Sequence, residues 1–219
     1  AGLCTAVMGS ANRYLLAGFH GDVEVGMFGV SSQMATMPLQ LISRSITVVL
    51  LPAAVDSYHD DPVRLCNLLS RAVQYTILLI LPVAAVGAGG GRWFLASFTK
   101  TSYVQAAPAL GVLLLASLLL ALTHVYRVVF MVFQQTPAIA RIAMIGAVVS
   151  LIVNLLLIPR LGFMGAAWTY LITQVLLLAL TIWSSRPLLR FAFAWKTLGV
   201  TMAGSGMLFV LLDRLTSDV

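Results

Sequence analysis

Seven runs of apolar residues divide this chain, and most of them approach the ~20 residues with which an α-helix crosses the hydrocarbon core of a bilayer. The runs cover residues 1–13, 25–54, 68–91, 107–133, 139–158, 165–183 and 197–212. Short polar segments separate them. Lipid offers no hydrogen-bond partner to the backbone, so apolar segments of this length are typical of helices that bond within themselves. The pattern therefore predicts a polytopic membrane protein.

The composition supports the same interpretation. Hydrophobic residues make up 60% of the 219 residues and charged residues only 9%, and the mean hydropathy is +1.00. Soluble domains carry about 25% charged residues. A water-soluble fold of this size has too little interior to hold so much apolar surface, so the composition excludes a soluble globular domain.

The fold class follows from the continuity of the apolar runs. Strands of a transmembrane β-barrel alternate apolar and polar residues over ~10 positions, whereas these runs are unbroken. We therefore expect an all-α, polytopic transmembrane helix bundle in which residues 1–219 form a single transmembrane region. The first run, 1–13, is too short to span and no charged segment precedes it, so we interpret it as the end of a helix that begins earlier in a longer transporter.

The formal net charge of +6 does not indicate a protein that binds nucleic acid. The 13 basic residues stand singly near the edges of the apolar runs, whereas nucleic-acid-binding proteins gather them in a patch or stripe. Basic residues at such edges set the orientation of membrane proteins. With the most polar segment, 56–67, in the cytoplasm, six basic residues lie on that side and five on the other. This bias has the expected sign, but it is too small to fix the orientation.

No pattern of reactive side chains predicts an enzyme. The two cysteines, Cys4 and Cys66, are far apart and the three histidines are scattered, so neither a metal site nor a disulfide framework is expected. The seven acidic residues are expected in loops or near the end of the chain, which leaves no acidic site for a coupling ion inside a helix. We expect no catalytic residue, no metal and no cofactor.

Ionisable residues inside the apolar runs are the strongest functional signal, because each costs ~2.5–3.5 kcal/mol at the centre of a membrane helix. Arg44 lies in the second run, and Arg127 lies in the fourth with His124 three residues earlier on the same face. An arginine that faces a cavity would attract a diphosphate, whose oxygens its guanidinium binds in a bidentate manner. Alternatively, the arginines extend to the lipid headgroups and His124 forms a hydrogen bond between helices.

Uncharged polar residues also recur inside the runs, at Gln33, Gln40, Asn154 and Gln174. They would line a hydrated path for a saccharide, or they would form hydrogen bonds between helices, which is the commoner role of such residues in membranes. From both groups of polar residues, the candidate substrate-binding residues are Arg44, Arg127, His124 and Gln40.

Three segments in a fixed order resemble the motifs of one transporter family. They are NRYLLAGF with VGMF (residues 12–19 and 25–28), YVQAAPAL (103–110) and NLLLIPRLGFMGAA (154–167). In order and spacing they resemble motifs in the C-terminal half of O-antigen-type polysaccharide flippases, which belong to the multidrug/oligosaccharidyl-lipid/polysaccharide exporter superfamily. Asn12 stands where the family usually has an acidic residue.

The resemblance implies that the chain is one lobe of a two-lobed bundle of twelve to fourteen helices with a central cationic cavity. Such a transporter would move an undecaprenyl-diphosphate-linked oligosaccharide across the bacterial inner membrane by alternating access, with an ion gradient as the driver. The partners it implies are the lipid-linked oligosaccharide, the lipid bilayer, the missing N-terminal half and the polysaccharide polymerase machinery. It also implies a cytoplasmic position for the segment 56–67.

Three other functions remain open. A sibling transporter of the same superfamily would export drugs or a peptidoglycan lipid. A membrane-embedded saccharide ligase or acyltransferase would need catalytic residues in a loop or cavity, and the longest loop, 56–67, contains acidic residues and His59 but no paired arrangement. A scaffold without transport activity would not need arginines inside its helices, so Arg44 and Arg127 are the residues whose substitution discriminates between these classes.

Overall fold

The computed structural model describes residues 12–60, 62–98 and 106–188. These residues form helices joined by short turns and contain no strand, so the expected all-α fold is confirmed for the part of the chain described. Of the seven apolar runs, 197–212 and all but the last two residues of 1–13 lie outside the described residues.

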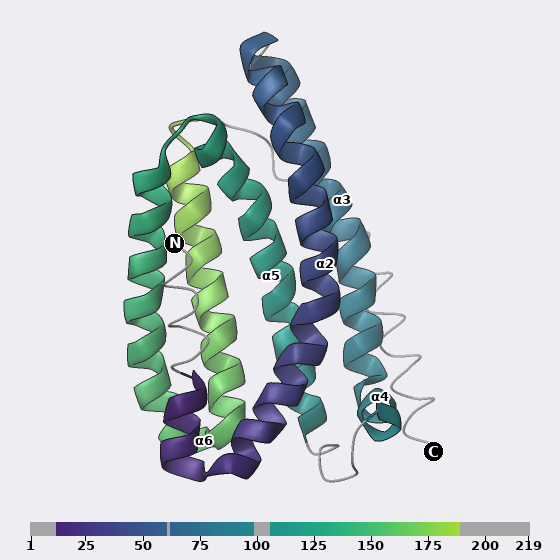
Figure 1. The fold of residues 1–219 in the computed structure, drawn as a ribbon, viewed down its shortest axis with the longest axis vertical. Coiled ribbons are helices and arrows are strands. Elements are labelled where there is room, and N and C mark those ends of the chain that lie inside the picture. Colours follow the sequence, from purple (N-terminus) through teal and green to yellow (C-terminus); the bar gives the residue numbers. More distant parts are fainter. Residues whose placement is uncertain (1–11, 61, 99–105, 189–219) are drawn as a thin grey trace.

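The helices run along a common direction and pack side by side. A short helix over residues 12–20 comes first. It is followed by α2 (Asp22–Asp60), α3 (Pro62–Gly89), α4 (Gly91–Phe98), α5 (Ala107–Val132) and α6 (Thr136–Ser185). Figure 1 shows α2, α3, α5 and α6 along the long axis of the molecule, with α4 at the lower end of α3. These four long helices are long and apolar enough to cross a membrane.

The most polar segment, 56–67, is largely helical where a loop was expected. α2 continues to Asp60 and α3 begins at Pro62. Proline suits the first turn of a helix because it has no amide hydrogen to leave unpaired. The 39 residues of α2 extend about 58 Å at ~1.5 Å per residue, which is well beyond the ~30 Å of a hydrocarbon core. The apolar run 25–54 marks only the part of α2 that lipid can surround, and the helix continues past it.

α6 is a hairpin of two antiparallel arms, which contain the apolar runs 139–158 and 165–183. Its backbone reverses at Gly162, whose φ of 56° and ψ of −134° lie outside the helical region. Figure 1 shows the chain returning alongside itself at this point. Gly146 on the first arm lies against the Leu177 side chain on the second, where a Cβ would come within 2.5 Å of it. A residue without a side chain therefore lets the two arms approach closely.

A carboxylate from α2 holds the reversal of α6. Glu24 Oε2 accepts a hydrogen bond of 2.9 Å from the Phe163 amide, which begins the second arm. The same carboxylate occupies the space beside Gly162, so that a Cβ there would overlap it. A negative charge is favourable at a helix N-terminus because the first amide groups have no partner in the helix. The expectation that all acidic residues lie in loops or near the end of the chain was therefore wrong for Asp22, Glu24, Asp56 and Asp60, which belong to α2. Glu24 also reaches a neighbouring helix.

α5 is the central helix of the bundle and packs against α2, α3 and α6. Its first half shares an apolar cluster with the first half of α2 and with the end of α6 that carries the reversal. Its second half shares another cluster with the second half of α2 and the first half of α3. On α2, the fully buried apolar residues stop at Leu39 and resume at Leu50. The polar residues of α2 and α5 meet in this interval.

Replacing Gly162 with alanine is expected to destabilise the hairpin by about 1–3 kcal/mol, because the residue has a backbone conformation that L side chains rarely adopt. The added methyl group would also displace the Glu24 carboxylate. Thermal unfolding in detergent measures the effect as a lower melting temperature. The control is Gly29→Ala on α2, where an added Cβ meets nothing within 4 Å. Equal melting temperatures for the two variants would contradict the role of Gly162.

Candidate substrate-binding site

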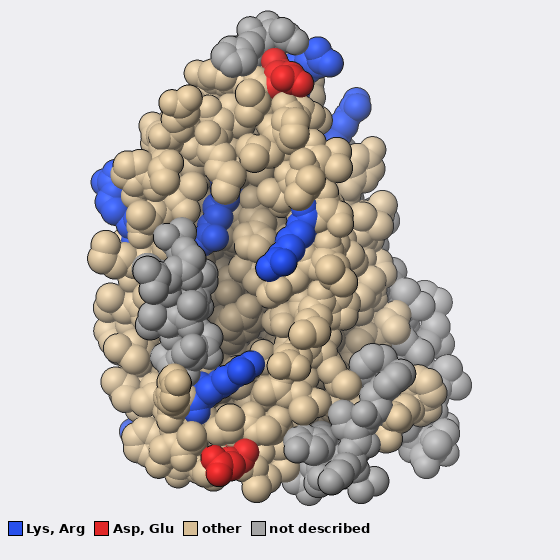
Figure 2. Space-filling model, in the orientation of Figure 1, with Lys and Arg blue, Asp and Glu red and all other residues tan. Residues whose placement is uncertain are grey.

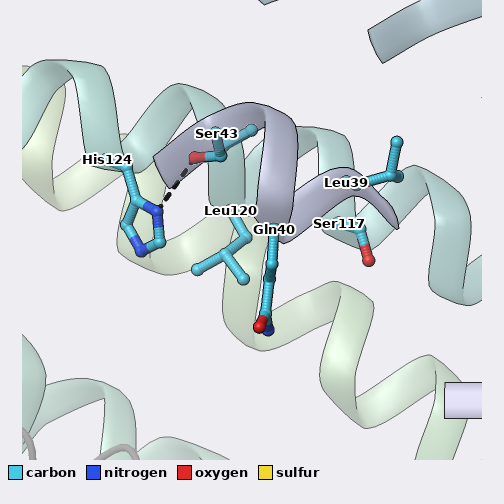
Figure 3. A pocket seen from close by; sticks show the side chains of 7 residues that line it. Leu39, Gln40, Ser43, Ser117, Leu120 and His124 are labelled. Atoms are coloured by element: carbon cyan, nitrogen blue, oxygen red, sulfur yellow. Dashed lines mark hydrogen bonds between the residues drawn. The ribbon is translucent and has the colours of Figure 1, made fainter. Parts of the chain in front are cut away.

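A small crevice opens between α2 and α5 in the interval between the two apolar clusters. Seven residues line it: Leu39, Gln40, Ser43, Ser117, Leu120, Ala121 and His124 (Figure 3). The empty space amounts to about 180 Å³, including its open side. The crevice itself has no room for a water-sized molecule, so it is a narrow gap between side chains and not a formed pocket.

Ser43 and His124 connect α2 to α5 across one end of the crevice. A hydrogen bond of 3.1 Å joins Ser43 Oγ and His124 Nδ1. Figure 3 shows that the ring places Nε2 on the same side as the Leu120 and Gln40 side chains. His124 therefore forms the hydrogen bond between helices that was one of its two expected roles, and its other nitrogen still faces the crevice.

Arg44 and Arg127 both come close enough to His124 to interact with it electrostatically. Arg44 is exposed on α2, and Arg127 is half-buried on α5. Figure 2 shows basic side chains gathered along a hollow in the middle of one face, whereas acidic side chains lie only near the two ends of that face. Two arginines that are 83 positions apart in the sequence (127 − 44) thus act on the same histidine, and the region around His124 would attract an anion.

The remaining polar residues predicted from the sequence lie elsewhere. Asn154 is fully buried, and its Nδ2 donates a hydrogen bond to Asn12 Oδ1. This contact ties the first arm of α6 to the short helix 12–20, which is the structural alternative expected for Asn154. Gln174 is buried on the second arm of α6, and Gln33 is exposed on α2. Only Gln40, of the four uncharged residues singled out, lines the crevice.

Sequence reasoning missed Ser43, Ser117 and Leu120. A signal for them existed in the helical spacing. Ser43 lies three residues after Gln40, and Leu120 and Ser117 lie four and seven residues before His124, so each shares a helix face with a residue that was singled out. Small hydroxyl side chains are common inside membrane helices. Without the position of the partner helix, nothing in the sequence distinguished Ser43 and Ser117 from the other serines.

The chemistry of the crevice suits binding better than catalysis. A serine bonded to a histidine also occurs in hydrolases, where a carboxylate orients the ring and stabilises its charged form. Here the two charged groups that approach the ring are both arginines. Among the described residues, no group of three His, Cys, Asp or Glu side chains could hold a metal ion. The arrangement offers positive charge for an anion and hydrogen-bonding groups beside it.

A comparison with known protein families identifies the family of this chain. A sequence profile described as the lipid II flippase MurJ matches residues 10–216, nearly the whole chain. The chain belongs to the MurJ lipid II flippase family. The expected flippase superfamily is thereby confirmed, although the profile names lipid II flippases and not the O-antigen type that the motifs resemble.

Two similar proteins extend this comparison. A solved structure of lipid II flippase MurJ in an inward closed conformation has a TM-score of 0.78 at 14% identity, and the match covers 95% of this chain and 44% of that one. An uncharacterized membrane protein of Methanocaldococcus jannaschii is 24% identical over 159 residues, which are 72% of this chain and 31% of that protein. The structural match shows that this chain has the fold of a part of that helical protein. The chain spans less than half the length of either protein.

The Ser43–His124 contact is expected to couple α2 to α5 energetically. In a double-mutant cycle with Ser43→Ala and His124→Leu, we expect an interaction free energy of about 0.5–1.5 kcal/mol, which is the range for hydrogen bonds between membrane helices. Unfolding of the purified protein in mixed detergent gives the four free energies. Ser45→Ala is the matched control, because Ser45 Oγ donates to the Leu41 carbonyl of its own helix. A coupling for Ser43 no larger than that for Ser45 would disprove the interhelical role.

Proposed function

We propose that the full-length protein is a flippase that moves a saccharide on a polyprenyl diphosphate across the bacterial inner membrane by alternating access. Membership in the MurJ lipid II flippase family supports this class of substrate. Within the class, we propose the lipid-linked precursor of peptidoglycan, to which the family's description points. The motifs that resemble O-antigen-type flippases make an undecaprenyl-diphosphate-linked oligosaccharide the second candidate.

The observation that carries the proposal is the meeting of Arg44 and Arg127 beside His124 within a bundle of apolar helices. Each arginine is costly inside a membrane helix. A diphosphate between them would offset both costs, because its oxygens accept charge-assisted hydrogen bonds from the guanidinium groups. Neither a scaffold nor an apolar drug as cargo accounts for two arginines at one place.

The exposure of Arg44 supports a ligand that meets this residue first, from outside the bundle. Arg127 is half-buried, whereas Arg44 is exposed. A headgroup would therefore pass from the exposed arginine to the half-buried one as it leaves water. We propose that a second lobe, against which this one would rock, supplies the remaining contacts with the substrate.

Substitution of either arginine tests the proposal. We expect Arg44→Ala and Arg127→Ala each to lower the initial rate of translocation at least tenfold, because each removes a charge-assisted contact worth ~1.5–3 kcal/mol. The measurement uses the full-length protein in proteoliposomes with a fluorescent lipid II, and protease protection verifies membrane insertion. Arg141→Ala is the control, because Arg141 is exposed on the first arm of α6. Normal translocation rates in both variants would show that Arg44 and Arg127 do not bind the diphosphate.

The same proteoliposomes decide between the two candidate substrates. We expect faster translocation of the lipid-linked peptidoglycan precursor than of an undecaprenyl-diphosphate-linked oligosaccharide of the O-antigen type. The reverse order would assign the protein to the O-antigen class, with the diphosphate site unchanged. Transport of an apolar cation without transport of either lipid would overturn the proposed function.

A further inference from the structure

We propose that residues 22–37, the first part of α2, form a lever that bends at Pro38 and is latched to the α6 reversal by Glu24, and that α2 straightens when this latch opens during transport. The inference rests on the proposed function, because it takes the transporter to alternate between two conformations. It adds which segment of this lobe moves and which contact holds that segment in place.

The course of α2 divides this helix into two parts. Figure 1 shows the first part inclined toward the α6 reversal, whereas the rest follows the long axis of the molecule. Kinks in helices are usually caused by proline, and Pro38 is the proline nearer to the start of α2. Its nitrogen has no hydrogen to donate to the Met34 carbonyl, four residues earlier. This bond is missing whether α2 is bent or straight, so α2 can change its angle here without losing another helical hydrogen bond.

The two parts of α2 pack against different regions of the bundle. Phe28, on the first part, belongs to the apolar cluster that includes the end of α6 with the reversal. Leu50, on the second part, belongs to the cluster shared with α3. Beyond the bend, the 3.1 Å hydrogen bond between Ser43 and His124 joins α2 to α5. The part of α2 that carries Arg44 is therefore tied to α5, and the first part can move without it.

Glu24 holds the far end of the lever. Its Oε2 accepts the 2.9 Å hydrogen bond from the Phe163 amide, and its carboxylate fills the space that Gly162 leaves beside the reversal. The two residues before it are not packed in this way, since Asp22 is exposed and the Val23 side chain is 71% exposed. One carboxylate therefore fixes the first turn of α2 against α6.

The chain before α2 allows the same movement. Gly21 joins the short helix over residues 12–20 to α2 with a φ of 84°, and a Cβ added to Gly21 would meet nothing within 4 Å. The short helix has its own tie to α6 through Asn12 and Asn154. When the latch opens, α2 can therefore change its angle at Gly21 while the short helix stays in place.

The polar contact decides between the two positions of the lever more than the apolar packing does. Lipid can replace the apolar neighbours of the first part of α2 at little cost, because hydrocarbon tails are as apolar as a leucine side chain. The Glu24 carboxylate cannot enter lipid in this way. It is half-buried in the first turn of α2, where water can take the place of the Phe163 amide. The latched and released positions thus differ chiefly by one charge-assisted hydrogen bond, and a transporter can shift such an equilibrium in each cycle.

A reversible crosslink tests whether the lever moves. Val23 and Leu161 are next to Glu24 and Gly162 in the chain, and both are exposed, so they accept cysteine and a reagent. The full-length protein, otherwise free of cysteine, carries Val23→Cys and Leu161→Cys in proteoliposomes with a fluorescent lipid II. We expect a bis-methanethiosulfonate crosslinker to lower the translocation rate at least tenfold and a reducing agent to restore it. A monofunctional methanethiosulfonate is the control and should leave the rate within twofold. A normal rate in the crosslinked protein would overturn the lever.

Spin labels on the same two cysteines test the latch without any substrate. Double electron–electron resonance gives the distribution of distances between the labels. We expect a main population at the latched distance and a longer one whose share rises at least threefold in Glu24→Ala. Asp22→Ala, which removes an exposed carboxylate from the same turn, is the matched control and should leave the distribution unchanged. Pro38→Ala restores the amide hydrogen and should also raise the share of the longer distance, because it favours a straight helix.

The outcomes separate failure of the latch from failure of the proposed function. The same distance distribution in Glu24→Ala as in the parent protein, or an equal change in Asp22→Ala, would overturn the latch. No change in Pro38→Ala would overturn the bend. Failure of the uncrosslinked protein to translocate any lipid-linked saccharide would overturn the proposed function, whereas the distances, measured without substrate, would still confirm or overturn the lever and its latch.

Discussion

Every polar side chain inside these helices has to find its hydrogen-bond partner within the protein, because lipid supplies none. Most hydroxyl groups meet this requirement within their own helix, as Thr76 does by donating to the Ala72 carbonyl one turn earlier. The larger polar groups meet it between helices, as Asn154 does with Asn12 and Glu24 does with the amide of residue 163. Apolar faces distinguish poorly between a neighbouring helix and lipid, so these few polar contacts carry much of the information about which helices pack together and in what register.

Among the described residues, this requirement is left open at Ser31 Oγ, Asn154 Oδ1 and Gln174 Oε1, and also at the proposed binding site. Gln40 has no hydrogen-bond partner among the described residues, and the charged groups that act on His124 are Arg44 and Arg127, with no carboxylate among them. Both features are unfavourable in an empty bundle and become favourable when a ligand with phosphate and hydroxyl groups is present. The free energy lost by leaving these groups unpaired is thus recovered on binding, which is how a transporter can prefer its loaded state without a rigid, preformed pocket.

The sequence was sufficient for the helical class and for the residues that lipid makes costly, and it was insufficient for contacts between distant segments. Arg44, Arg127 and His124 could be singled out because a charged or ionisable residue inside an apolar run is conspicuous by itself. Ser43 could not, because its significance depends on a partner 81 positions away. Glu24 was placed in a loop for the same reason, since hydropathy shows where lipid can surround a helix but not where the helix begins or which amide its carboxylate reaches.

The contact between Glu24 and the hairpin also has a consequence for how the protein is made. Glu24 and the amide it accepts from are 139 residues apart in the chain. At ~5–20 residues per second, the ribosome needs roughly 7 to 28 seconds to synthesise the intervening segment. During that time the Glu24 carboxylate lacks this partner. The hydrogen bond can form only after the reversal of α6 has been synthesised. The register of α2 against α6 is therefore fixed late in synthesis.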